Sequence, residues 1–104
     1  MKAHILVVDD DVFMAKILSF VLSDNGYQTS MLPDPAAVLP FLDEHPVNLV
    51  LLDVMLPHTD GFSLCAAIRR AHPDLPVLLL TDIVTKPFEP MDLLVRIRAI
   101  LSSL

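Results

Sequence analysis

The chain has 104 residues, 54% of them hydrophobic, and a formal net charge of −6. This length fits one domain over residues 1–104 with a buried core, and no apolar run approaches the roughly 18 residues of a membrane span. The acidic balance, without a cluster of Lys or Arg, argues against direct nucleic-acid binding. The amino terminus shows no cleavage-site pattern, and the single Cys65 is expected to be a core residue, so we expect a cytoplasmic protein without a membrane partner.

Four short apolar runs alternate with segments of helical period, which is typical of repeated βαβ units. Runs that are apolar throughout are expected to be buried on both faces, as in a parallel sheet. The sequence therefore predicts an α/β domain with a parallel sheet and helices on both of its faces. The predicted strands are His4–Val8, Tyr27–Met31, Asn48–Leu52 and Val77–Leu80.

The first two helices are predicted between these runs. The first ends at Asn25-Gly26, a favourable left-handed cap. The second covers Pro35 to Glu44 and contains Pro40, so we expect it to be short or kinked. The stripe expected to face the core from the first helix is Phe13, Met14, Ile17, Leu18, Val21 and Leu22.

The last two helices have clear boundary signals. The third is expected from about Phe62 to Ala71 and breaks before His72-Pro73. Pro90 suits the first position of the last helix, which reaches about Leu101. Its expected buried face is Leu93, Leu94, Ile97 and Leu101.

Two of the predicted strands end in carboxylates. Asp9, Asp10 and Asp11 follow the first run, and Asp53 follows the third. The carboxyl ends of parallel strands meet at one edge of the sheet, where open α/β folds gather ligand groups. Carboxylates brought together there repel one another unless a cation lies between them, which indicates Mg²⁺ held by oxygen ligands. For Asp11 we favour a different role, that of capping the following helix.

The order of several short motifs resembles the receiver domain of two-component response regulators. Val-Asp-Asp is followed by Leu-Asp-Val-Met-Leu-Pro with Gly61 beyond it, then by Leu-Thr, and finally by Thr-Lys-Pro-Phe. Each motif alone is a weak signal, but their joint order is specific. The resemblance extends from the first strand to the last helix and implies a flavodoxin-like fold.

The resemblance implies that Asp53 accepts a phosphoryl group from a sensor histidine kinase or a phosphotransfer protein. Asp9 and Asp10 would hold Mg²⁺ together with the Asp53 carboxylate and the backbone carbonyl of Met55. A carboxylate between Leu52 and Val54 is poorly explained by solvation alone, which also favours a functional role.

The resemblance also assigns two residues to the phosphate oxygens. Lys86 would pair with one of these oxygens, and Thr81 would donate its hydroxyl to another. A Thr at a strand end is often only a β-former, and the nearby Thr85 competes for the role of Thr81.

The chain departs from the family between Thr81 and Lys86. Typical receivers have five strands and five helices, with a helix between these two positions, but only residues 82–85 separate them here. Neighbouring parallel strands need a crossover of roughly a dozen residues. We therefore expect four strands in the order 2-1-3-4, with the last helix covering the surface of the missing fourth helix. The alternative is one unbroken strand from Val77 to Thr85, which would give the role of Thr81 to Thr85.

The shortened build has consequences for assembly and output. The edge of Val77–Leu80 would lack a neighbour, so we expect a homodimer through this edge or the last helix. In the family the fourth helix, fifth strand and fifth helix form the output surface, and Ile83 stands here in place of an aromatic reporter. A competing hypothesis is therefore an interaction module whose output does not depend on phosphorylation.

An enzymatic alternative fits the sequence less well. An aspartyl-phosphate phosphatase of the haloacid-dehalogenase type needs a second carboxylate two residues after the nucleophile, where this chain has Met55. We therefore expect a phosphoacceptor that assists its own phosphotransfer and is not an enzyme.

Overall fold

The structure is a computed structural model that describes residues 2–53, 60–80 and 90–102. None of the helices in these ranges is long and apolar enough to cross a membrane. The elements in chain order are β1 His4–Val8, α1 Val12–Asp24, β2 Gln28–Leu32, the 3₁₀ helix η1 Pro35–Ala37, α2 Val38–Glu44, β3 Leu49–Asp53, α3 Gly61–Ala71, β4 Val77–Leu80 and α4 Pro90–Ser102.

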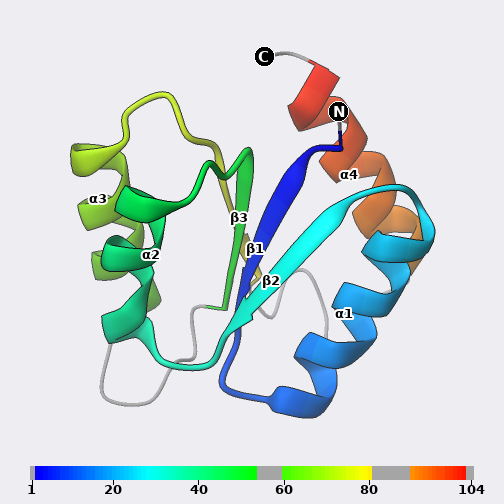
Figure 1. Cartoon of the computed structure of the whole chain (residues 1–104), viewed down its shortest axis with the longest axis horizontal. Coiled ribbons are helices and arrows are strands. Elements are labelled where there is room, and N and C mark those ends of the chain that lie inside the picture. Colours follow the sequence, from blue (N-terminus) through cyan, green and yellow to red (C-terminus); the bar gives the residue numbers. More distant parts are fainter. Residues whose placement is uncertain (1, 54–59, 81–89, 103–104) are drawn as a thin grey trace.

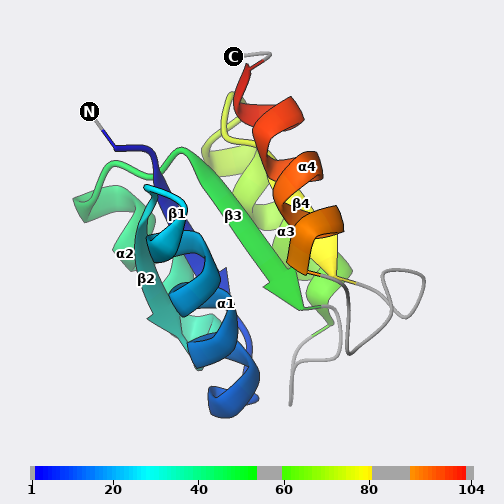
Figure 2. The ribbon, with the colours of Figure 1, turned by 90° about the vertical axis from the view of Figure 1, so that its right-hand side faces the viewer.

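The four strands form one parallel sheet in the order β2-β1-β3-β4. Helices α1 and α4 cover one face of the sheet, and α2 and α3 cover the other (Figure 1). Turning the molecule by 90° brings α1 and α4 to the front, where they lie side by side (Figure 2). The predicted four-stranded α/β fold and its strand order are confirmed.

Two apolar clusters, one on each face of the sheet, form the core. Alternate residues of β1 point to opposite faces: Ile5 and Val7 pack with α1 and α4, whereas Leu6 and Val8 pack with α2 and α3. All residues of β1 and β3 are buried, as expected for the central strands of a parallel sheet. Cys65 is buried in the second cluster, which confirms its predicted place in the core.

The orientation of α1 differs from the prediction. The expected stripe contained Phe13 and Ile17, but their side chains are 74% and 40% exposed. The fully buried side chains of α1 are Ala15, Leu18 and Leu22. Because the segment is apolar around most of its circumference, hydrophobic periodicity alone did not define which face contacts the sheet.

The helix boundaries follow local signals. Gly26 has a φ of 90° just after the end of α1, the left-handed conformation expected there. Pro40 is the third residue of α2, where its missing N–H would have no partner within the helix, so α2 is short but continuous from Val38. In α4 the predicted Leu93, Leu94 and Ile97 are buried, whereas the predicted Leu101 is only half-buried.

The position of α4 corrects one expectation about the missing helix. Crossovers between parallel strands are right-handed, so a helix leading from β4 to a strand beyond it would lie on the face that α3 covers. Helix α4 instead packs beside α1, and the Arg98 guanidinium donates to Asn25 Oδ1 at 3.3 Å. The last helix therefore does not replace the missing helix. The connection between β4 and α4, which contains Ile83 and Thr85, lies outside the described residues.

Candidate functional site

The register of the sheet brings the predicted acids together. Val8 of β1 is paired with Leu52 of β3, so Asp9 and Asp53 follow at the same level of two adjacent strands. Each of Asp9, Asp10 and Asp53 offers a carboxylate oxygen, and these three oxygens all lie within 4.8 Å of one another. The predicted acid cluster is therefore present at the carboxyl edge of the sheet.

The burial of the cluster is uneven. The side chains of Asp9 and Asp53 are only 1% and 3% exposed, whereas Asp10 is exposed to solvent. Asp9 Oδ1 also accepts a hydrogen bond of 2.9 Å from the backbone amide of Asp11, which orients the carboxylate. Two buried carboxylates side by side repel each other and lose hydration, so this arrangement favours a bound cation.

The donor set fits a hard divalent cation. All three side chains of the cluster offer carboxylate oxygens, which are the ligands that Mg²⁺ prefers, and the exposed side at Asp10 leaves room for water ligands. The four His residues have no metal-ligand spacing. Among the described residues, Asp9, Asp10 and Asp53 can thus hold a metal ion.

Asp11 has the capping role that the sequence favoured. Its Oδ1 accepts a hydrogen bond of 3.1 Å from the amide of Met14, and its backbone conformation is extended, as at a helix N-cap. Asp11→Ala should therefore lower the free energy of unfolding by about 1 kcal/mol. It should leave Mg²⁺ affinity unchanged in a calorimetric titration. A large loss of Mg²⁺ affinity would instead place Asp11 among the metal ligands.

Three predicted site residues belong to other segments of the chain. Met55, Thr81 and Lys86 all lie outside the described residues. β4 is described up to Leu80, which is in register with Asp53. The roles of these three residues remain predictions.

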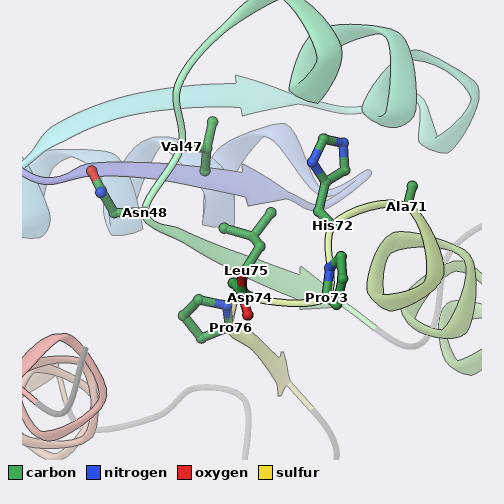
Figure 3. A pocket seen from close by; sticks show the side chains of 8 residues that line it. All are labelled: Val47, Asn48, Ala71, His72, Pro73, Asp74, Leu75 and Pro76. Atoms are coloured by element: carbon green, nitrogen blue, oxygen red, sulfur yellow. The ribbon is translucent and has the colours of Figure 1, made fainter.

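A cavity of about 400 Å³ lies at the opposite end of the sheet, where β3 and β4 begin (Figure 3). Two of its polar side chains, those of His72 and Asn48, already have partners. His72 Nε2 lies 3.2 Å from Asp43 Oδ1, and Asn48 Oδ1 accepts a hydrogen bond of 2.8 Å from the amide of His4. This cavity therefore offers fewer available groups for binding or reaction than the acid cluster does.

The sequence analysis did not predict an exposed apolar face on α1. Phe13, Ile17 and Phe20 follow one another at helical spacing, and the two Phe side chains are 74% and 73% exposed. Helix α1 starts three residues after Asp9, so this face begins beside the acid cluster. The signal in the sequence is a helix with more apolar residues than one face can bury.

Comparisons with known proteins agree with this architecture. A model of the response regulator receiver domain matches residues 5–86. The probable transcriptional regulator ycf27 of Galdieria sulphuraria is 39% identical over 118 residues, which cover 96% of this chain and 46% of the relative. The DNA-binding response regulator MtrA of Mycolicibacterium paratuberculosis is 36% identical, over 95% of this chain and 51% of MtrA. The fold also matches the Francisella response regulator 1452 receiver domain, with a TM-score of 0.88 at 23% identity over 98% of both chains.

The alignment lengths show that the first relative is longer within the matched region. Its alignment spans 118 positions, whereas 96% of this 104-residue chain is about 100 residues, so about 18 positions of the relative have no counterpart here. That number suffices for one average helix and one average strand, of about 11 and about 5 residues. The chain also spans about half the length of the curated relatives it matches. Since the family model extends from β1 past the end of β4, the chain belongs to the response regulator receiver domain family.

Proposed function

We propose that this chain is a phosphorelay switch that accepts a phosphoryl group on Asp53. The observation that carries the proposal is the cluster of three carboxylates at the carboxyl edge of the sheet, two of them buried. Within the cluster, Asp53 is the last residue of the central strand β3. It also occupies the position that the phosphoacceptor has in the family's motif. Asp9 and Asp10 are then left as metal ligands. We propose one receiver module over residues 1–104.

The proposed reaction moves one phosphoryl group between two side chains. An oxygen of the Asp53 carboxylate forms a bond to phosphorus as the bond between phosphorus and a histidine nitrogen of the donor breaks. The imidazole that leaves takes up a proton from solvent. Lys86 and Thr81, as the family resemblance implies, would neutralise and hydrogen-bond two phosphoryl oxygens. This chemistry makes the chain a phosphoacceptor that assists its own transfer.

In this proposal the protein supplies four metal ligands. They are the carboxylates of Asp9, Asp10 and Asp53 and the backbone carbonyl of Met55. When bound, Mg²⁺ would neutralise charge on the transferring phosphoryl oxygens. The buried Asp9 carboxylate is held in place by the Asp11 amide, so it can coordinate without first being ordered. Because the protein supplies few ligands, affinity for Mg²⁺ should be weak until phosphate oxygens are present.

The proposed donor is a sensor histidine kinase or a histidine phosphotransfer protein. The exposed apolar face of α1, formed by Phe13, Ile17 and Phe20, offers such a donor a contact surface next to the acid cluster. Large exposed apolar faces of this kind mark protein interaction sites. The exchange would take place in the cytoplasm. We propose no direct contact of residues 1–104 with nucleic acid, because they carry a net charge of −6 and no cluster of Lys or Arg.

Phe20→Ala should separate protein donors from small donors. We expect the second-order rate of transfer from a phosphorylated donor protein to fall by about tenfold or more, since an exposed aromatic anchor is lost. The rate with acetyl phosphate should not change, because Phe20 lies nine residues after Asp11, about 2.5 turns along α1. Met31→Ala, which removes an exposed apolar side chain from β2, is the matched control. Equal losses with both donors would contradict a docking role.

A second candidate function rests on the short connection between β4 and α4. Nine residues, 81–89, join the two elements, fewer than a strand crossover requires. The family's output surface is therefore shortened, which favours an interaction module whose output does not depend on phosphorylation. Amide NMR spectra with and without beryllofluoride and Mg²⁺ separate the two functions. Shifts confined to the acid cluster favour the module, whereas shifts that reach β4 and α4 favour the switch.

A further inference from the structure

The outer edge of β4 is an apolar strand edge. Within the described part of the chain, β4 pairs only with β3, and β2 forms the other edge of the sheet. Val77, Leu78 and Leu79 are half-buried, whereas every residue of β3 is buried. Edge strands that are apolar and uncharged are templates for pairing with another strand.

The hydrogen-bond pattern between β3 and β4 determines which backbone groups face this edge. The amide of Val50 donates to the carbonyl of Pro76 at 3.1 Å, and Val50 is in register with Val77. In a parallel ladder of this phase, Leu78 and Leu80 direct their N–H and C=O groups toward β3. Val77 and Leu79 therefore direct theirs away from β3, to the outer edge.

We infer that β4 pairs with β4 of a second copy of this chain, antiparallel, about a two-fold axis at Leu78. In this register Val77 of one copy lies opposite Leu79 of the other, and each of the two such pairs exchanges two hydrogen bonds. Leu78 lies opposite its own counterpart on the face that α1 and α4 cover. The two four-stranded sheets become one continuous sheet across the dimer.

The strand's own sequence favours a second copy over a different partner. Val-Leu-Leu-Leu is self-complementary, because antiparallel pairing about Leu78 places aliphatic side chains opposite one another on both faces. No residue of β4 is charged, so no like charges meet across the axis. The other edge, β2, begins Gln-Thr-Ser and is partly exposed, which disfavours head-to-tail pairing of β4 with β2.

The family comparison points in the same direction. The G. sulphuraria relative contains about 18 aligned positions that this chain lacks, enough for another strand within its own chain. Among the described residues no strand lies beyond β4, and a second copy of the chain can supply one. The net charge of −6 on each copy opposes association at long range, so added salt should tighten the dimer by screening this repulsion.

Sedimentation equilibrium tests this inference with variants of the whole chain. Val77→Pro removes an outward N–H at the first residue of the strand, where proline is tolerated. We expect the dissociation constant to rise by about a hundredfold, because each lost bond weakens pairing by about tenfold and a symmetric dimer loses two. Leu79→Lys, which introduces a charge at an edge residue, should also raise the dissociation constant. Met31→Lys on β2 is the control and should leave the dimer intact.

Hydrogen exchange supplies a measurement that needs no variant. The amides of Val77 and Leu79 should exchange slowly at concentrations at which the protein is dimeric and quickly after dilution. A protein that stays monomeric at all accessible concentrations overturns the inference. So does a dimer that survives Val77→Pro and Leu79→Lys but is lost on Val95→Lys, since Val95 is exposed on α4 and this result would place the interface on the last helix.

Discussion

We expect Asp53→Asn to abolish the uptake of a phosphoryl group from a small phosphodonor in the presence of Mg²⁺. The amide has nearly the same shape as the carboxylate but is neutral and a poor nucleophile, so the initial rate should fall by at least about a thousandfold. Asp53 is buried between its neighbours at the end of β3, and Asn fills the same space. Intact mass measured over time, with acetyl phosphate as donor, follows the adduct directly.

The matched control for this change is Asp60→Asn. Asp60 is an exposed acid at the N-cap of α3, where its Oδ1 accepts from the amide of Phe62 at 3.0 Å. Asn is as good a capping residue as Asp, so the fold and the phosphoryl uptake should both remain. If the adduct forms at full yield in Asp53→Asn, the assignment of the acceptor is wrong.

Asp10→Ala should strongly weaken metal binding without loss of stability. Asp10 belongs to the cluster of carboxylates whose oxygens lie within 4.8 Å of one another, and it is the exposed member. Removal of one of few protein ligands should weaken Mg²⁺ binding by at least about a hundredfold and prevent phosphorylation at ordinary Mg²⁺ concentrations. Calorimetric titration and the mass assay measure the two effects.

Unlike Asp11→Ala, Asp10→Ala should not destabilise the metal-free protein. Loss of Asp10 relieves repulsion within the cluster, so the free energy of unfolding should stay the same or rise by up to about 0.5 kcal/mol. Added Mg²⁺ should stabilise the wild type but not Asp10→Ala, since only the wild type binds it in the folded state. A titration curve that Asp10→Ala leaves unchanged would remove Asp10 from the ligand set.

The sheet was predictable because its strands carry a strong local signal. Residues 5–8 and 77–80 are apolar without interruption, and the strands His4–Val8 and Val77–Leu80 both occur with the predicted bounds. The strand order then followed from the motifs that resemble a known family. The third strand occurs one residue later than predicted, as Leu49–Asp53, which makes Asp53 its last residue.

The faces of the helices were harder to predict. In α1 nine of the 13 residues are apolar, so the pattern could not distinguish Ala15, which packs in the core, from Phe13, which is exposed. The place of α4 was also wrong, because a helix with one apolar face can pack on either side of a parallel sheet until the crossover that leads to it is known. Such choices depend on tertiary contacts that local sequence does not encode.

The position of the acid cluster could be predicted from the sequence. Parallel strands in register place Asp9 and Asp53 side by side, which follows from apolar runs that each end in Asp. Asp11 was separated correctly as a cap because it precedes the helix directly. The parts of the site that depend on Met55, Thr81 and Lys86 remain predictions.

Chemical mapping of the acceptor tests the central claim most directly, because it needs no substitution. The wild-type protein is phosphorylated with Mg²⁺ and acetyl phosphate, the acyl phosphate is reduced with borohydride to the corresponding alcohol, and peptides are sequenced by mass spectrometry. The proposed function predicts one reduced residue, Asp53, with Asp9 and Asp10 unchanged. Reduction at Asp9 or Asp10, or a phosphoryl group that resists borohydride on another side chain, would contradict it.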